Sequence, residues 1–225
     1  MNLAVIGSGG REHAICYKLK QSPKIQKLIC IPGNAGTEKI AQNINEDILN
    51  FDALYQIIKK QKIDIVVVGP EQPLVRGLVN YLNEKKIRVF GPDKFSSQLE
   101  GSKAFMKNLC KKNNIPTANF GVFNNFNDAS SFIEKNGVPI VVKADGLAAG
   151  KGVSICNSTE KALKDVKEIL DGKFKSSNKV VLEEFLEGEE LSYFSVVDKN
   201  SYHFFGSAQD HKRVGEGDTG PNTGG

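Results

Sequence analysis

The chain has 225 residues, of which 30 are basic and 26 acidic, so its formal net charge is +4. A composition of 40% hydrophobic and 25% charged residues is typical of a globular protein and excludes wholesale disorder. No apolar run approaches the roughly 20 residues of a membrane-spanning helix. The small, scattered positive surplus does not indicate nucleic-acid binding. We therefore expect neither a membrane nor a nucleic acid as a partner.

The cysteines and the N-terminus both indicate a cytoplasmic protein. The four cysteines lie far apart without a CxxC pair, which predicts reduced, buried thiols rather than a zinc site or a disulfide scaffold. Residues 1–7 have no basic segment before the apolar run, so they are not expected to be a signal peptide. The length favours two domains over one.

The first hundred residues alternate short apolar runs with amphipathic segments. Four runs rich in valine and isoleucine, each ended by glycine or glycine with proline, are predicted as buried strands: residues 3–6, 27–31, 63–68 and 87–90. Helical spacing lies between them, over residues 14–19, 53–60 and 74–83. This alternation predicts a parallel sheet with helices on both faces, whose ligands bind beyond the carboxyl ends of the strands.

The pattern changes after a helical stretch at residues 95–113 that is broken near Gly101, where we place the domain boundary. The second half is predicted to be α+β. Its expected strands are residues 138–145, 153–156, 179–186, 191–197 and 202–208, and its expected helix runs to residue 170 from a cap at Ser158 or Thr159. The glycine-rich residues 215–225 have little to bury, so they are either a frayed tail or part of a functional loop.

Three glycine turns lie at the carboxyl edge of the predicted parallel sheet. Residues 7–13 (GSGGREH) resemble the dinucleotide fingerprint, except that Glu12 takes the place of its last glycine. The second strand ends in the turn at residues 32–37 instead of the acid that would bind a ribose, and residues 69–71 form the third turn. Simple tight turns are the alternative for any one segment. Together they favour a phosphorylated ligand smaller than NAD.

A loop of small residues, 146–152, lies between two predicted strands, with Lys143 before it and Lys151 inside it. Such a loop can fold over phosphates and donate backbone N–H groups. It is not a P-loop, because Gly152 stands where serine or threonine is required. An ordinary mobile turn is the alternative, but Lys143 is costly to bury without an anion.

Two polar segments of the second half are less specific. The acids and apolar pair at residues 183–190 suit a purine nucleoside, although a solvated acidic turn is more common. The cluster at residues 209–213, followed by residues 218–225, suits a substrate or phosphate clamp, although His211 alone is more often structural. No catalytic triad and no metal-ligand spacing is recognisable.

Taken together and in order, six segments resemble the phosphoribosylamine–glycine ligase family of the ATP-grasp superfamily: residues 7–14, 32–37, 69–71, 143–153, 209–213 and 220–225. The resemblance runs over the whole chain and the set is specific, whereas any one motif would indicate only an ATP-grasp ligase. It implies a parallel-sheet, Rossmann-like pre-ATP-grasp domain at residues 1–102. An incomplete α+β ATP-grasp domain would follow at residues 103–225, with a nucleotide-lid subdomain at about 120–190.

The resemblance also implies a reaction of purine biosynthesis. ATP, glycine and 5-phosphoribosylamine would give glycinamide ribonucleotide, ADP and phosphate, with glycyl phosphate as the intermediate. Phosphoryl transfer of this kind depends on positioning and charge neutralisation more than on a protein nucleophile. That dependence suits a sequence rich in lysine and glycine with no recognisable triad.

Roles for individual residues follow from the resemblance. ATP phosphates would contact Lys103 and Lys143, under a lid that includes Gly146, Gly150, Lys151 and Gly152. Adenine would be held by Glu183, Phe185 and Leu186, and the ribose by Glu190. Phosphoribosylamine would be bound by Gly9, Gly10, Arg11, Asn34 and Glu71. The site where glycine meets the γ-phosphate would be lined by Asp210, Lys212, Arg213 and Asn222, and the catalytic group would be Lys143, Asp210, Lys212 and Arg213.

The family continues beyond Gly225, and the resemblance places its Mg²⁺ or Mn²⁺ ligands there. We therefore expect no metal ligand among these residues, no turnover by them alone, and exposed apolar surface on the second half. Three alternatives stay open: a different ATP-grasp ligase acting on another carboxylate, a non-catalytic nucleotide-binding module, and an NAD-dependent oxidoreductase. The oxidoreductase is the weakest, because the acid after the second strand is missing.

Overall fold

The structure is a computed structural model that describes residues 1–148, 151–174, 178–209, 211, 213–217 and 219–222. The chain forms two compact units, Met1–Phe185 and Leu186–Gly225. Each unit is described by itself.

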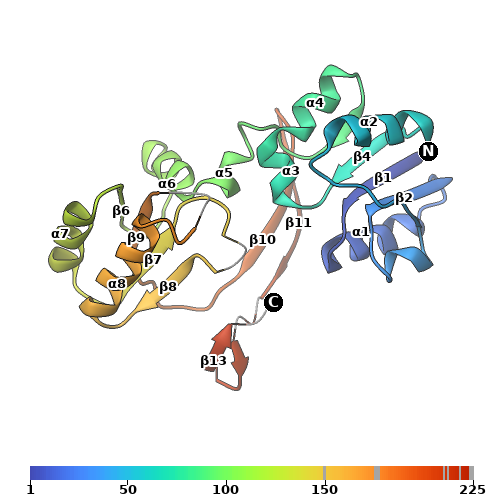
Figure 1. The fold of residues 1–225 in the computed structure, drawn as a ribbon. Coiled ribbons are helices and arrows are strands. Elements are labelled where there is room, and N and C mark those ends of the chain that lie inside the picture. Colours follow the sequence, from blue (N-terminus) through green and yellow to red (C-terminus); the bar gives the residue numbers. More distant parts are fainter. Residues whose placement is uncertain (149–150, 175–177, 210, 212, 218, 223–225) are drawn as a thin grey trace. The chain divides into compact units, whose positions relative to one another are not determined.

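A five-stranded parallel sheet opens the first unit (Figure 1). In spatial order its strands are β3 (Gln42–Asn43), β2 (Lys27–Pro32), β1 (Asn2–Gly7), β4 (Ile65–Val68) and β5 (Arg88–Phe90). The predicted parallel sheet is confirmed, and each predicted run contains a strand. Strand β3 was not predicted, because a two-residue edge strand has no hydrophobic pattern of its own.

Helices cover both faces of this sheet because alternate residues of β1 point to opposite sides. Leu3 and Val5 pack with Cys16 of α1 (Gly10–Lys20). On the other face, Ala4 and Ile6 pack with α2 (Phe51–Lys60) and α4 (Leu78–Glu84). A short 3-10 helix, η1 (Thr37–Lys39), follows β2. The single helix predicted over residues 74–83 is instead split into α3 (Glu71–Arg76) and α4, because Gly77 adopts a left-handed conformation with φ of 96°.

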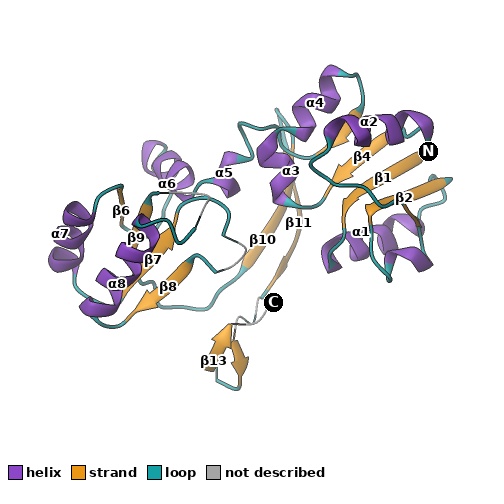
Figure 2. Ribbon diagram, viewed as in Figure 1, coloured by secondary structure: helices purple, strands orange, loops and turns teal. Residues whose placement is uncertain are grey.

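The rest of the first unit is built on a four-stranded antiparallel sheet (Figure 2). Its strands are ordered β6 (Phe120–Phe123), β9 (Val180–Glu184), β7 (Ile140–Ala144) and β8 (Val153–Cys156). Helices α7 (Phe126–Asn136) and α8 (Thr159–Leu170) contribute Ile133 and Val166 to the core formed with this sheet. The predicted hairpin of β7 and β8 is confirmed, and Ser158 is the cap of α8. The sequence analysis did not predict β6 and α7.

Two short helices connect the two sheets of this unit. They are α5 (Gln98–Gly101) and α6 (Lys103–Lys112), which confirms the predicted helical stretch with its break near Gly101. Ser102 is the residue between them, and its hydroxyl accepts a hydrogen bond from the Phe105 N–H at the start of α6. The turn between the two helices therefore fixes where Lys103 begins α6.

The second unit consists of two antiparallel ribbons. Strands β10 (Ser192–Val197) and β11 (Tyr202–Ala208) form the first, as predicted, and β12 (Arg213–Gly215) and β13 (Thr219–Asn222) form the second. Residues 219–222 are thus a paired strand, so the alternative of a frayed tail is wrong for them. Apolar side chains on both faces of the β10–β11 ribbon are exposed, including a stacked pair, Tyr193 and Phe204, with ring centroids 4.5 Å apart. The expected exposure of apolar surface is confirmed.

Two further expectations concern the whole described chain. Within the described ranges no helix is long and apolar enough to cross a membrane. All four cysteines are free thiols; Cys16, Cys30 and Cys156 are buried, and Cys110 is partly buried.

We predict that Leu54→Ala destabilises the first unit by about 2–5 kcal/mol, because Leu54 is fully buried between α2 and the sheet and its removal leaves a cavity. Since the chain has no tryptophan, the free energy of unfolding is measured by circular dichroism during urea titration. The matched control is Leu109→Ala on the exposed side of α6, with an expected change within about 0.5 kcal/mol. Equal losses in the two variants would contradict the core assigned here.

Candidate active site

The turn between β1 and α1 holds a buried carboxylate. Glu12 is 4% exposed, and its Oε2 accepts a hydrogen bond from the Gly9 N–H at 2.7 Å. The carboxylate fits because Gly7 and Gly69 have no side chain: a Cβ at Gly69 would overlap Oε1 of Glu12, and one at Gly7 would lie 2.6 Å from its carboxyl carbon. Glu12, which stands where the fingerprint has its last glycine, therefore occupies the turn itself and accepts the hydrogen bond of the Gly9 amide.

Asn34 joins the first two glycine turns. Its side-chain NH₂ donates to the carbonyl oxygens of Ser8 and Gly9, at 2.8 and 3.2 Å. Its side-chain oxygen accepts from the N–H groups of Gly36 and Thr37, at 2.8 and 2.9 Å. The amide therefore already has two donor and two acceptor contacts, and its demonstrated role is to hold the two turns together.

Arg11 joins the first turn to the third. The guanidinium donates to the Gly69 carbonyl at 2.7 Å and forms an ion pair of 2.9 Å with Glu71. Partial burial acts to raise the pKa of the Glu71 carboxyl. The hydrogen bond from its own backbone N–H and the neighbouring Arg11 outweigh that effect, so the pKa lies below its ordinary value. Both side chains stay partly exposed, so an ionised pair faces the surface of the site.

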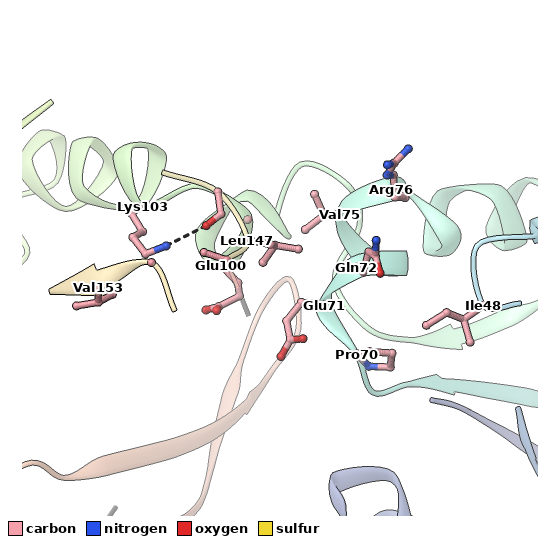
Figure 3. A pocket seen from close by; sticks show the side chains of 14 residues that line it. Ile48, Pro70, Glu71, Gln72, Val75, Arg76, Glu100, Lys103, Leu147 and Val153 are labelled. Carbon is pink, nitrogen blue, oxygen red and sulfur yellow. Dashed lines mark hydrogen bonds between the residues drawn. The ribbon is translucent and has the colours of Figure 1, made fainter. Parts of the chain in front are cut away.

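Glu71 of this pair lines a cavity of about 920 Å³ (Figure 3). Its volume suits a nucleotide-sized ligand. Four of the predicted site residues line it: Glu71, Lys103, Gly146 and Gly152. The sequence analysis missed three further polar lining residues, Gln72, Arg76 and Glu100. In the close view the carboxylates of Glu71 and Glu100 extend to the same side, whereas Arg76 points the other way.

Asp145 fixes the position of the residues on either side of Lys103 in the cavity wall. This carboxylate, 8% exposed, accepts hydrogen bonds from the Ser102 hydroxyl at 3.0 Å and the Ala104 N–H at 3.1 Å. It therefore fixes the start of α6 beside the end of β7. Lys103 itself donates to the Gly146 carbonyl at 2.9 Å, so it ties the start of α6 to the small-residue loop. Burial lowers the pKa of Lys103, and the carboxylates of Asp145 and Glu100 offset part of that shift.

Lys143 on β7 lies beside Glu183 on β9, because the two strands are adjacent and antiparallel. Its Nζ is 2.8 Å from Oε2 of Glu183, and Lys107 of α6 reaches the same oxygen at 2.9 Å. The other carboxylate oxygen, Oε1, is buried and has no hydrogen-bond partner among the described residues. The sequence analysis did not single out Lys107. The sequence does carry one indication of its burial. Lys107 follows Ala104 by three positions, so the two residues lie on the same, buried face of the helix.

Two of the remaining predicted residues, Lys151 and Phe185, belong to the first unit but do not line this cavity. Lys151 is exposed and its backbone N–H donates to the Ala148 carbonyl. Phe185 is partly buried at the end of the first unit. Leu186, Glu190, Arg213 and Asn222 belong to the second unit, where Arg213 and Asn222 are paired across β12 and β13. Gly150, Asp210 and Lys212 lie outside the described residues.

Three carboxylates at or near the cavity, Glu71, Asp145 and Glu183, already have partners within the protein. Glu71 is paired with Arg11 and Glu183 with two lysines, while Asp145 accepts from a hydroxyl and a backbone amide. In the part of the chain that the structure describes, no group of three or more His, Cys, Asp or Glu side chains could hold a metal ion. These three carboxylates, as the structure pairs them, therefore do not fit Mg²⁺ or Mn²⁺.

Comparison with known proteins now gives the class. Residues 1–100 match the family model "Phosphoribosylglycinamide synthetase, N domain", and residues 101–225 match "Phosphoribosylglycinamide synthetase, ATP-grasp (A) domain". The class is thus that of the ATP-grasp proteins, in agreement with the parallel sheet followed by an antiparallel one. The chain belongs to the phosphoribosylglycinamide synthetase family, which confirms the resemblance found in the sequence.

Individual relatives agree with the family. The chain is 51% identical over 226 aligned residues to a phosphoribosylamine–glycine ligase of Brucella melitensis and 48% identical to one of Mesorhizobium japonicum. Each alignment covers 100% of this chain and 53% of the relative. The crystal structure of the phosphoribosylamine–glycine ligase of Thermotoga maritima superposes with a TM-score of 0.84 at 34% identity, covering 100% of this chain and 54% of that one. The chain thus spans about half the length of these relatives.

We predict that Gly69→Ala lowers the free energy of unfolding by about 1–3 kcal/mol, because the added methyl group must displace the buried Glu12 carboxylate. The measurement is urea unfolding followed by circular dichroism. Gly10→Ala is the matched control: its Cβ would meet nothing within 4 Å, so its expected change is within about 0.5 kcal/mol. A Gly69→Ala variant as stable as the control would contradict the packing of Glu12 described above.

We predict that Arg11→Gln raises the pKa of the Glu71 carboxyl, because it removes the ion pair and hydrogen bond that favour the ionised form. The pKa of Glu71 is below that of the unfolded chain, so the ionised group stabilises the fold above its unfolded pKa. That contribution disappears as the pH falls through the folded pKa, and it is smaller in the variant. Carboxyl-carbon NMR titration measures the shift. Arg88→Gln, on the exposed β5, should leave the Glu71 titration unchanged.

Proposed function

We propose that the cavity and the three glycine turns form the nucleotide and phosphoribosylamine sites of an ATP-dependent ligase. The ligase would join glycine to 5-phosphoribosylamine. The observation that supports this most directly is the cavity, since one wall holds Glu71, the partner of Arg11, and another holds Lys103 and the loop at Gly146. The high identity to proteins named phosphoribosylamine–glycine ligase supports the choice of substrates.

In this proposal the glycine carboxylate attacks the γ-phosphorus of ATP, so ADP leaves and glycyl phosphate forms. The amine of phosphoribosylamine then attacks the carbonyl carbon, and phosphate leaves as the amide bond forms. Lysine ammonium groups neutralise phosphate charge without becoming covalently attached. Two lysines would do so. Lys103 lines the cavity, and Lys143 interacts electrostatically with Lys103.

The adenine end of the nucleotide is proposed to lie near β9. Oε1 of Glu183 is a buried acceptor that lacks a partner among the described residues, and leaving such an atom unpaired is costly. The exocyclic amine of adenine is a donor of suitable chemistry. The roles proposed for Phe185 and Leu186 at adenine, and for Glu190 at the ribose, come from the family resemblance. The same source supports Gly146, Gly150, Lys151 and Gly152 as the lid.

The phosphoribosylamine end is proposed to lie at the three glycine turns. Arg11 is the cation available for its phosphate, and Asn34 keeps the first two turns in contact. Gly9, Gly10 and Glu71 complete this proposed subsite. The residues proposed for the meeting point of glycine and the γ-phosphate are Asp210, Lys212, Arg213 and Asn222.

We further propose how the chain is divided and where the protein acts. The domains would divide at residues 102 and 103, with a nucleotide-lid subdomain at about 120–190. The protein would act on small molecules in the cytoplasm, without a nucleic-acid or membrane partner. We also expect the 225 residues alone to bind nucleotide without turnover, because Glu71, Asp145 and Glu183 are paired within the protein and not available to the divalent cation that the family resemblance implies.

We predict a crossed pattern of binding defects, measured by isothermal titration calorimetry on the 225-residue chain. Lys143→Met should weaken ATP binding about tenfold or more and leave glycinamide ribonucleotide binding unchanged, because the lost cation lies at the nucleotide end. Arg11→Gln should do the reverse. Lys135→Met, on the exposed side of α7, is the charge-matched control and should change neither affinity.

The alternatives give different outcomes in the same titrations. Binding of ATP without any binding of glycinamide ribonucleotide would favour another ATP-grasp ligase. Binding of NAD instead of ATP would favour an oxidoreductase. Glycine-dependent ADP release by the natural gene product that contains these residues, with phosphoribosylamine as acceptor, distinguishes the ligase from a non-catalytic nucleotide-binding module.

A further inference from the structure

Lys107 is a buried cation whose counter-ion, Glu183, also pairs with a second lysine. Its side chain is 4% exposed, and that of its partner Glu183 is 5% exposed. The same carboxylate oxygen also pairs with Lys143, which is 24% exposed. Three charged side chains therefore meet at one point, two positive and one negative, so the group has a net charge of +1.

The surroundings of Lys107 hold its ammonium group in place. It donates a hydrogen bond to the Thr117 hydroxyl at 2.7 Å, in addition to the 2.9 Å contact with Glu183. Its Nζ also lies 5.7 Å from the centre of the Phe120 ring, which is within the range of a cation–π contact. An ammonium group with two directed contacts and an aromatic face has little freedom to leave. Lys107 is therefore a fixed charge.

Only one of the two lysines is accessible to a ligand. Each ammonium nitrogen is less than 3 Å from the same oxygen, so the two nitrogens lie within roughly 6 Å of each other. Lys107 is enclosed, whereas Lys143 is partly exposed and interacts electrostatically with Lys103 of the cavity wall. The positive charge that a ligand meets is thus that of Lys143.

We propose that Lys107 is a positioning residue for the nucleotide phosphates, and that it acts through Glu183. Because Lys107 pairs with Glu183, this carboxylate does not fully neutralise the charge of Lys143. Lys107 also fixes the position of the carboxylate, and the carboxylate in turn orients Lys143. The inference rests on the proposed ATP site. Without Lys107 the same pair would have no net charge, so its attraction for polyphosphate would fall.

A purely structural role makes a different prediction. If Lys107 only fills the space between α6 and β9, then its loss should weaken the fold without a selective effect on phosphate. A further change at Glu183 should then alter the stability of the fold without restoring phosphate binding. If instead the net charge matters, neutralising Glu183 as well should restore the charge of +1 and recover phosphate binding.

The test compares ATP with AMP by isothermal titration calorimetry on the 225-residue chain. The ratio of the two affinities isolates the contribution of the β- and γ-phosphates and cancels changes at adenine. We expect Lys107→Gln to lower this ratio about tenfold, and the double variant Lys107→Gln with Glu183→Gln to recover most of it. Thr117→Val, which keeps the charges, should change the ratio less than Lys107→Gln does. Lys111→Gln, one turn along α6 and exposed, is the matched control.

Each outcome decides the inference. An unchanged ratio in Lys107→Gln, or an equally low ratio in the double variant, would overturn it. If Lys107→Gln does not fold by circular dichroism, the double variant alone decides, with a ratio near that of the unchanged chain supporting the inference and a lowered ratio overturning it. If the unchanged chain binds neither ATP nor inorganic tripolyphosphate, the proposed nucleotide site is overturned together with the inference. If the unchanged chain binds ATP and Lys107→Gln does not change the ratio of ATP to AMP affinity, the inference is overturned and the proposed nucleotide site is retained.

Discussion

The contact between the Glu12 carboxylate and the Gly9 amide is the interaction on which the N-terminal part of the site depends. It places a negative charge in a space that only glycine at positions 7 and 69 leaves open, and so joins the ends of β1 and β4 to the start of α1. Arg11, the neighbour of Glu12 in sequence, is thereby directed to the Gly69 carbonyl and to Glu71. A buried carboxylate thus organises the edge of the sheet where the cation Arg11 is presented.

The proposed nucleotide side is organised by the opposite arrangement, a surplus of positive charge in which Lys107 is buried and Lys103 and Lys143 are partly buried. Lys107 and Lys143 share one oxygen of Glu183, while Lys103 is bound to the Gly146 carbonyl near Asp145. Burying cations with too few counter-ions is unfavourable unless an anion completes the site, so this arrangement is suited to phosphate. The N-terminal side is built from backbone turns around the Glu12 carboxylate. The other side is built from lysines of β7 and α6 around the Glu183 carboxylate of β9.

Much of the fold could be predicted because the signals are local. Buried parallel strands are continuous apolar runs, and the helix of residues 159–170 has a serine cap. The glycine turns could be located because a strand ends at each. The edge strand β3, the division at Gly77 and the pairing of residues 219–222 were missed, because short elements depend on their neighbours rather than on their own pattern. Strand β6 and helix α7 were missed as well, although α7 is eleven residues long. Of the cavity lining, Glu71, Lys103, Gly146 and Gly152 were foreseen, but Gln72, Arg76 and Glu100 were not.

The sequence by itself determined the fold class, most of the longer elements and the family, since these depend on periodicity and on motifs that are contiguous in the chain. Only the tertiary structure decided which charges meet. Lys107 and Glu183 are 76 positions apart in sequence, and whether a carboxylate faces one lysine or two depends on how β7, β9 and α6 pack. The physical reason is that electrostatic interactions depend on distance in space, which spacing along the chain does not specify.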